Sequence, residues 1–168
     1  MRYDLNNMTD YTLTIFTENI PGVLYRIADV FLRRKINVES LTVSELYPPD
    51  KSRFTIVINT TEEQIIKIAA QIEKIIEVLE VYYNTDEGLI YHEIALIKIA
   101  IKNLQDLSEV QKVVGESPTA KIFSIYEDSI VIEESGTEKE VRGFIEKLGS
   151  FKIQDLAISG RTAVLKNH

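Results

Sequence analysis

The chain has 168 residues, of which 45% are hydrophobic and 27% are charged, and its formal net charge is −7. This composition is typical of a globular protein with one medium domain or two small ones. The acidic balance argues against nucleic-acid binding, which requires basic surfaces. The chain has no cysteine and only two histidines, so disulfides, thiolate zinc sites and histidine metal sites are excluded.

Targeting signals are not evident in the sequence. Residues 1–10 form a polar N-terminal extension without the apolar core of a signal peptide. No apolar run approaches the roughly 18 residues of a membrane span. We therefore expect a cytoplasmic protein without membrane contact.

The first half of the chain predicts the element order β-α-β-β-α-β. Alternating apolar residues predict strands, and apolar residues repeating every three or four positions predict helices. Thr61 and Gln64 have the spacing of a capping box at a helix start. The expected elements are a strand at 11–16, a helix from Val23, strands at 37–46 and around 54–58, a helix from Ile65, and a strand at 78–83.

The second half repeats this order after a polar linker at residues 85–88. Thr137 and Glu140 have the spacing of a further capping box, and Gly115 stops the third helix. The expected elements are a strand at 94–101, a helix from Leu104, strands at 121–126 and 129–133, a helix from Val141, and a strand at 151–158.

Two such units in tandem predict an α+β protein made of two ferredoxin-like sandwiches, at residues 11–84 and 89–165. Each unit has only about 75 residues, which is marginal for an independent core. The open sheet faces and edges also need cover. We therefore expect oligomerisation or docking onto a partner protein.

The most informative segment is 17–27, where a strand ends and a helix begins after a turn containing Asn19, Pro21 and Gly22. The free backbone N–H groups and the positive dipole end of a helix start favour a bound carboxylate or phosphate. No group capable of covalent chemistry lies beside this turn, so we predict binding of a small anion and no catalytic residue.

These residues resemble a known family. The run from Glu18 to Arg26, Glu-Asn-Ile-Pro-Gly-Val-Leu-Tyr-Arg, and the run 37–43, Asn-Val-Glu-Ser-Leu-Thr-Val, are similar to the ACT domain of acetolactate synthase (acetohydroxyacid synthase) small regulatory subunits. In the second half, the strand at 93–99 and the turn Ser159-Gly160-Arg161 resemble that family too. The similarity covers nearly all of residues 11–165.

The resemblance implies a regulatory subunit without activity of its own. Such a subunit binds and activates the catalytic subunit of acetolactate synthase and confers feedback inhibition by valine or a related branched-chain amino acid. The regulated reaction belongs to branched-chain amino-acid biosynthesis (valine and isoleucine). Thiamine diphosphate, Mg and FAD are expected only in the catalytic subunit, and no cofactor in this chain.

The resemblance also places the effector between the ACT domains of a homodimer. Backbone N–H groups near Gly22 would hold the effector carboxylate, and Asn37 of the other protomer would accept from its ammonium group. The predicted effector-binding residues are Asn19, Pro21, Gly22, Val23, Leu24, Asn37 and Val38.

One residue departs from the family pattern. The family commonly has glycine where this chain has Lys35. If that position has a positive φ, lysine costs about 1 kcal/mol there.

Three other functions are compatible with parts of the sequence. A free-standing amino-acid-binding ACT regulator would have the same helix-start site, but the run 37–43 and the second unit disfavour it. A small enzyme is disfavoured because the chain has no paired acid–base constellation. An RNA-binding module is disfavoured because the central strands carry no aromatic and basic stripe.

Overall fold

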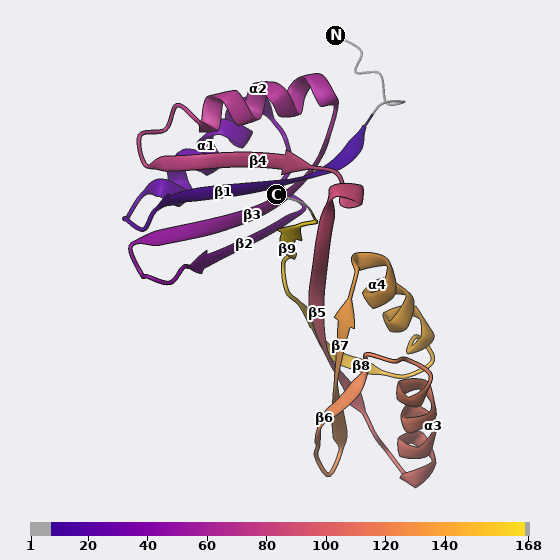
Figure 1. Cartoon of the computed structure of the whole chain (residues 1–168). Coiled ribbons are helices and arrows are strands. Elements are labelled where there is room, and N and C mark those ends of the chain that lie inside the picture. Colours follow the sequence, from indigo (N-terminus) through magenta and orange to yellow (C-terminus); the bar gives the residue numbers. More distant parts are fainter. Residues whose placement is uncertain (1–7, 167–168) are drawn as a thin grey trace. The chain divides into compact units, whose positions relative to one another are not determined.

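The chain divides into two compact units. The computed structural model describes residues 8–166. Of these residues, the first unit contains 8–90 and 161–166, and the second contains Tyr91–Gly160. Within each unit the helices pack on one face of an antiparallel sheet (Figure 1). The predicted α+β fold of two ferredoxin-like sandwiches is confirmed.

The elements follow the predicted order, with a short 3₁₀ helix and a ninth strand in addition. In the first half they are β1 (Thr9–Glu18), α1 (Val23–Arg34), β2 (Ser40–Glu45), β3 (Lys51–Thr60), α2 (Glu62–Ile72), β4 (Val78–Asn84) and η2 (Asp86–Gly88). In the second half they are β5 (Leu89–Ala100), α3 (Leu104–Gly115), β6 (Lys121–Ile125), β7 (Ser129–Gly136), α4 (Glu138–Lys147), β8 (Ile153–Ile158) and β9 (Thr162–Leu165).

The first unit has a sheet with the strand order β2-β3-β1-β4. Alternate residues of β1, such as Leu13 and Ile15, point to the helices and are fully buried. They pack against the apolar faces of α1 and α2, represented by Ile27 and Ile68. Burying these faces supplies the main stabilisation of the sandwich, because apolar area removed from water contributes about 25 cal/mol per Å².

The second unit repeats this construction with the strand order β6-β7-β5-β8. Ile97 and Ile99 of β5 are fully buried beneath α3 and α4, where Val110 and Phe144 complete the core. The capping box predicted at the start of α4 is complete, since Thr137 and Glu140 each bond the backbone of the other.

The structure differs from the prediction at both ends of the chain. Within the expected extension 1–10, residues 1–7 lie outside the described residues, and β1 already begins at Thr9. The expected second unit, 89–165, included a closing segment that the structure groups with the first unit. Two hydrogen bonds join this segment to the first unit: the carbonyl of Ala163 accepts from Arg53, and the Lys166 N–H donates to the Gly88 carbonyl. Its strand β9 pairs with β5, which begins at Leu89 in the first unit and continues into the second.

Candidate functional site

The turn between β1 and α1 leaves a helix start open. Gly22 precedes the helix with φ 93° and ψ −12°, and no side chain caps the helix. The other α-helices in residues 8–166 are all capped, by Thr61, Asn103 and Thr137. The first turn of α1 also contains no acidic residue. The N–H groups of this turn and the helix dipole therefore remain available to an external anion.

Gly22 is required by its own backbone conformation. A positive φ of 93° is one that residues with a Cβ rarely adopt. A Cβ built at this position would meet no atom within 4 Å, so the space over the turn is open. Gly22 thus allows both the turn and the close approach of a ligand.

The side chain of Asn19 has a structural role in this turn. Its Nδ2 donates to Glu45 Oε1 at 2.8 Å, and its Oδ1 accepts from Ser52 Oγ at 3.0 Å. These bonds join the turn to the β2–β3 hairpin. Contact of Asn19 with an effector stays a prediction, and the second lone pair of its Oδ1 is the acceptor that these bonds leave for it.

The apolar residues at the helix start divide between core and surface. Val23 is 3% exposed and packs into the core, so it offers an effector its backbone N–H and not its side chain. Leu24 is 46% exposed and lies at the surface beside it. Pro21 lies in the turn and precedes the helix, where its fixed φ suits the approach to the first turn.

Asn37 and Val38 lie in the connection between α1 and β2, because β2 begins only at Ser40. Asn37 is exposed and donates from Nδ2 to Glu39 Oε1 at 3.1 Å, and this bond does not use its Oδ1. Val38 is partly buried against the core of the first unit.

Lys35 controls the direction in which this connection leaves α1. It has φ 54° and ψ 39°, which is the left-handed region. Its N–H donates to the Leu32 carbonyl at 3.0 Å, and the Ile36 N–H donates to the Phe31 carbonyl at 3.1 Å. This pair of bonds is a Schellman motif, which usually has glycine at the left-handed position. Lys35 therefore occupies a conformation that its side chain disfavours.

One protomer does not bring the two predicted halves of the site together. Gly22 precedes α1 and Asn37 follows it, and α1 has 12 residues. At 1.5 Å per residue this helix separates the two halves by about 18 Å. A free amino acid cannot span that distance, so contact with both halves requires a second protomer.

The second unit has the same turn without an open helix start. The Ile101 N–H donates to the Asp128 carbonyl at 2.8 Å, as the Asn19 N–H does to the Asp50 carbonyl at 2.9 Å in the first unit. Here, however, the Asn103 side chain caps α3. The Lys102 N–H is also satisfied, by the Asp106 carboxylate at 2.9 Å.

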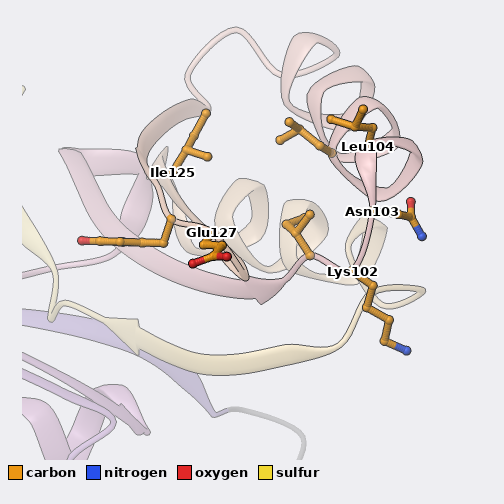
Figure 2. Close-up of a pocket in the computed structure, with 8 residues that line it drawn as sticks. Lys102, Asn103, Leu104, Ile125 and Glu127 are labelled. Atoms are coloured by element: carbon orange, nitrogen blue, oxygen red, sulfur yellow. The ribbon is translucent and has the colours of Figure 1, made fainter.

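At the start of α3 the second unit has a pocket of about 230 Å³ that is lined mainly by apolar side chains. It lies between the start of α3 and the β6–β7 hairpin, with Leu104 and Ile125 on opposite sides (Figure 2). The side chains of Lys102 and Asn103 are directed away from it (Figure 2). Among the α-helices in residues 8–166, only α1 of the first unit therefore begins without a side-chain cap.

Metal sites and membrane-spanning helices are not found among the described residues. No group of three or more His, Asp or Glu side chains within residues 8–166 could hold a metal ion. Among the described helices, none is long and apolar enough to cross a membrane.

Comparisons with known proteins agree with this fold. The model of the AHAS small subunit-like ACT domain matches residues 13–80, and the model described as small subunit of acetolactate synthase matches residues 92–167. The crystal structure of the acetolactate synthase small subunit from Thermotoga maritima matches with a TM-score of 0.85 and 28% identity, covering 95% of this chain and 98% of that one.

Two curated relatives match over most of their length. A probable acetolactate synthase small subunit from Archaeoglobus fulgidus is 32% identical over 160 residues, covering 94% of this chain and 98% of the relative. The acetolactate synthase small subunit of Bacillus subtilis is 31% identical over 152 residues, covering 90% of this chain and 87% of the relative.

The fold and the first matching model define an ACT-domain protein. With nearly the whole chain matched, the assignment is more specific: the chain belongs to the acetolactate synthase small subunit family. The resemblance noted in the sequence is confirmed.

Proposed function

We propose that this chain is a regulatory subunit of acetolactate synthase. It binds and activates the catalytic subunit in the cytoplasm, and it confers feedback inhibition by valine or a related branched-chain amino acid. The observation that carries the effector-binding part of this proposal is the uncapped start of α1 behind Gly22, in a chain that belongs to the family.

The effector site is formed by two protomers. The N–H groups that follow Gly22 in one protomer hold the effector carboxylate, and the Asn37 Oδ1 of the other protomer accepts from its ammonium group. The exposed side chain of Leu24 and the partly buried Val38 provide apolar surface for the effector side chain. The separation of the two halves by α1 supports this arrangement.

The edge strand β2 is the surface on which the first units of two protomers pair. β2 bonds only β3 within the described sheet, so its other edge is open to a strand of a second copy. Leu41 and Val43 of this strand are 43% and 45% exposed. Pairing of β2 with its copy would cover these side chains and bring the two halves of the effector site closer.

Regulation follows if the effector prefers one arrangement of the two protomers. A ligand shifts an equilibrium only by its difference in affinity for the two states. Allosteric coupling of this kind is typically about 1–3 kcal/mol. A site between protomers depends on their arrangement, so effector binding can change the surface that meets the catalytic subunit.

In this proposal the catalytic subunit supplies the chemistry. Thiamine diphosphate, Mg and FAD belong to that subunit, and this chain contributes no group to the condensation of pyruvate with pyruvate or 2-oxobutyrate. The chain acts on the reaction only through its contact with the catalytic subunit.

Reconstitution with the catalytic subunit tests the proposal. Gly22→Asp is expected to leave activation intact and to abolish inhibition by valine, because it adds a negative charge where the effector carboxylate binds. Gly22→Asn is the matched control, since asparagine is equally large, neutral and tolerant of a positive φ. It should weaken inhibition less than Gly22→Asp does.

Two outcomes would count against the proposal. Undiminished valine inhibition in Gly22→Asp would remove the helix-start site. Failure of the unmodified chain to associate with any acetolactate synthase catalytic subunit, together with saturable amino-acid binding, would point instead to a free-standing ACT regulator.

A further inference from the structure

The closing segment contributes a buried cation to the first unit. Arg161 is 1% exposed, although arginine is among the residues least often buried. It stands at the point where the chain re-enters the first unit after Gly160. A buried guanidinium must be well paired to be tolerated.

Arg161 contacts three separate parts of the first unit. Its Nη1 donates to Thr12 Oγ1 of β1 at 2.9 Å and to Asp86 Oδ1 of η2 at 2.6 Å. Its backbone N–H donates to Ser40 Oγ at 2.9 Å. The central strand, the first residue of the edge strand and the connection after β4 are therefore joined through one residue.

The contact with Ser40 bears on the predicted effector site. Ser40 is the first residue of β2, and it directly follows the connection that contains Asn37 and Val38. The Glu39 N–H in this connection is already bonded to the Val57 carbonyl at 2.9 Å. The bond from Arg161 thus fixes the end of the connection nearest to β2, and with it the position from which Asn37 projects.

The same contacts involve both places where the chain passes between the two units. Asp86 lies shortly before the chain leaves the first unit after Ile90, and Arg161 is the residue with which it returns. The whole second unit lies between these two residues in the sequence. The ion pair between Arg161 and Asp86 therefore joins the segment that precedes the second unit to the segment that follows it.

We propose that Arg161 is a positioning residue of the effector site, which it fixes through Ser40 and Asp86 without touching the effector. This inference rests on the proposed function. In this proposal the segment that follows the second unit determines, through Arg161, the position of the first residue of β2.

Two variants of the full chain test the proposal. Arg161→Lys keeps the charge, but its shorter side chain does not place an ammonium group at the position of Nη1 between Thr12 and Asp86. Asp86→Asn removes the charge of the partner and keeps an acceptor oxygen. Lys166→Met is the matched control, because Lys166 lies on the same segment and its Nζ donates to the Glu87 carbonyl, away from Ser40.

The first measurement is amide hydrogen exchange of the free protein. Exchange in residues 37–41 should be at least several-fold faster in Arg161→Lys and Asp86→Asn than in the unmodified chain, with α2 and the Lys166→Met variant unchanged. Unchanged exchange in residues 37–41 in both variants would overturn the proposal. A uniform increase over the whole first unit would also overturn it, since that indicates general destabilisation.

The second measurement is valine binding by calorimetry at a temperature where each variant is folded. Affinity should fall about tenfold in Arg161→Lys, within the range of allosteric couplings, and stay unchanged in Lys166→Met. Equal affinity of Arg161→Lys and the unmodified chain would contradict the proposal. If the unmodified chain binds no branched-chain amino acid, the proposed function fails, while the exchange result still decides whether Arg161 positions the start of β2.

Discussion

The left-handed lysine at the end of α1 leads to a stability prediction. Lys35 has φ 54° and ψ 39°. This conformation costs a residue with a Cβ about 1–2 kcal/mol. Glycine avoids this cost, but it loses about 0.5–1 kcal/mol more conformational entropy on folding. Lys35→Gly should therefore stabilise the protein by about 0.5–1 kcal/mol.

Thermal denaturation of the full chain, followed by circular dichroism, measures this change. In a chain of this length each kcal/mol corresponds to about 2–4 °C in the midpoint. Lys35→Ala should change little, because alanine retains the Cβ. Leu32→Gly introduces glycine at a 74% exposed position within the helix and should cost about 1 kcal/mol.

The result that would refute the reasoning is a Lys35→Gly variant no more stable than the unmodified chain. A gain of equal size in Lys35→Ala would also refute it, since the effect would then come from loss of the lysine side chain.

Further predictions concern the helix caps and the open edge of the first sheet. Asn103→Ala should destabilise the protein by about 1 kcal/mol in urea denaturation, because it leaves the Asp106 N–H without its cap; no loss would contradict the cap. Bonds from the Thr137 backbone and side chain hold the pKa of the Glu140 carboxyl below its ordinary value. The stability that these hydrogen bonds provide is present above the pKa of this carboxyl in the unfolded chain, and it is lost as the pH falls through its lower pKa in the folded protein. Glu140→Gln should therefore flatten the acid side of a plot of unfolding free energy against pH. Val43→Lys should give a monomer in light scattering without loss of fold, and an unchanged oligomer would argue against pairing through β2.

Much of the fold could be predicted because its local patterns agree with its packing. Alternation in strands such as β1 and the apolar stripe of α2 are set by side chains that face one core. The capping box at Thr137 and Glu140 was visible because both members lie three residues apart. Strand β9 was missed because four residues carry too little alternation to stand out, and its pairing with β5 is long-range.

The site could be predicted less completely. The open helix start follows from the Asn-Ile-Pro-Gly turn, and it is present at Gly22. The left-handed conformation of Lys35 closes the Schellman motif at the end of α1 with lysine at the position that usually holds glycine, so the residue type does not announce it. The burial of Arg161 runs against the usual preference of arginine for the surface. In the proposed site the two halves meet only between two protomers, and the sequence of one chain does not show how protomers pair.

The most direct test of the shared site is complementation between two defective variants. Gly22→Asp and Asn37→Ala should each bind valine poorly in calorimetry. If each site takes Gly22 from one protomer and Asn37 from the other, a mixed dimer of the two variants contains one intact site and one doubly defective site. Random co-assembly of equal amounts should then restore binding with native affinity at about a quarter of the sites. Absence of any restored binding, in a sample shown to contain mixed dimers, would contradict a site shared between protomers.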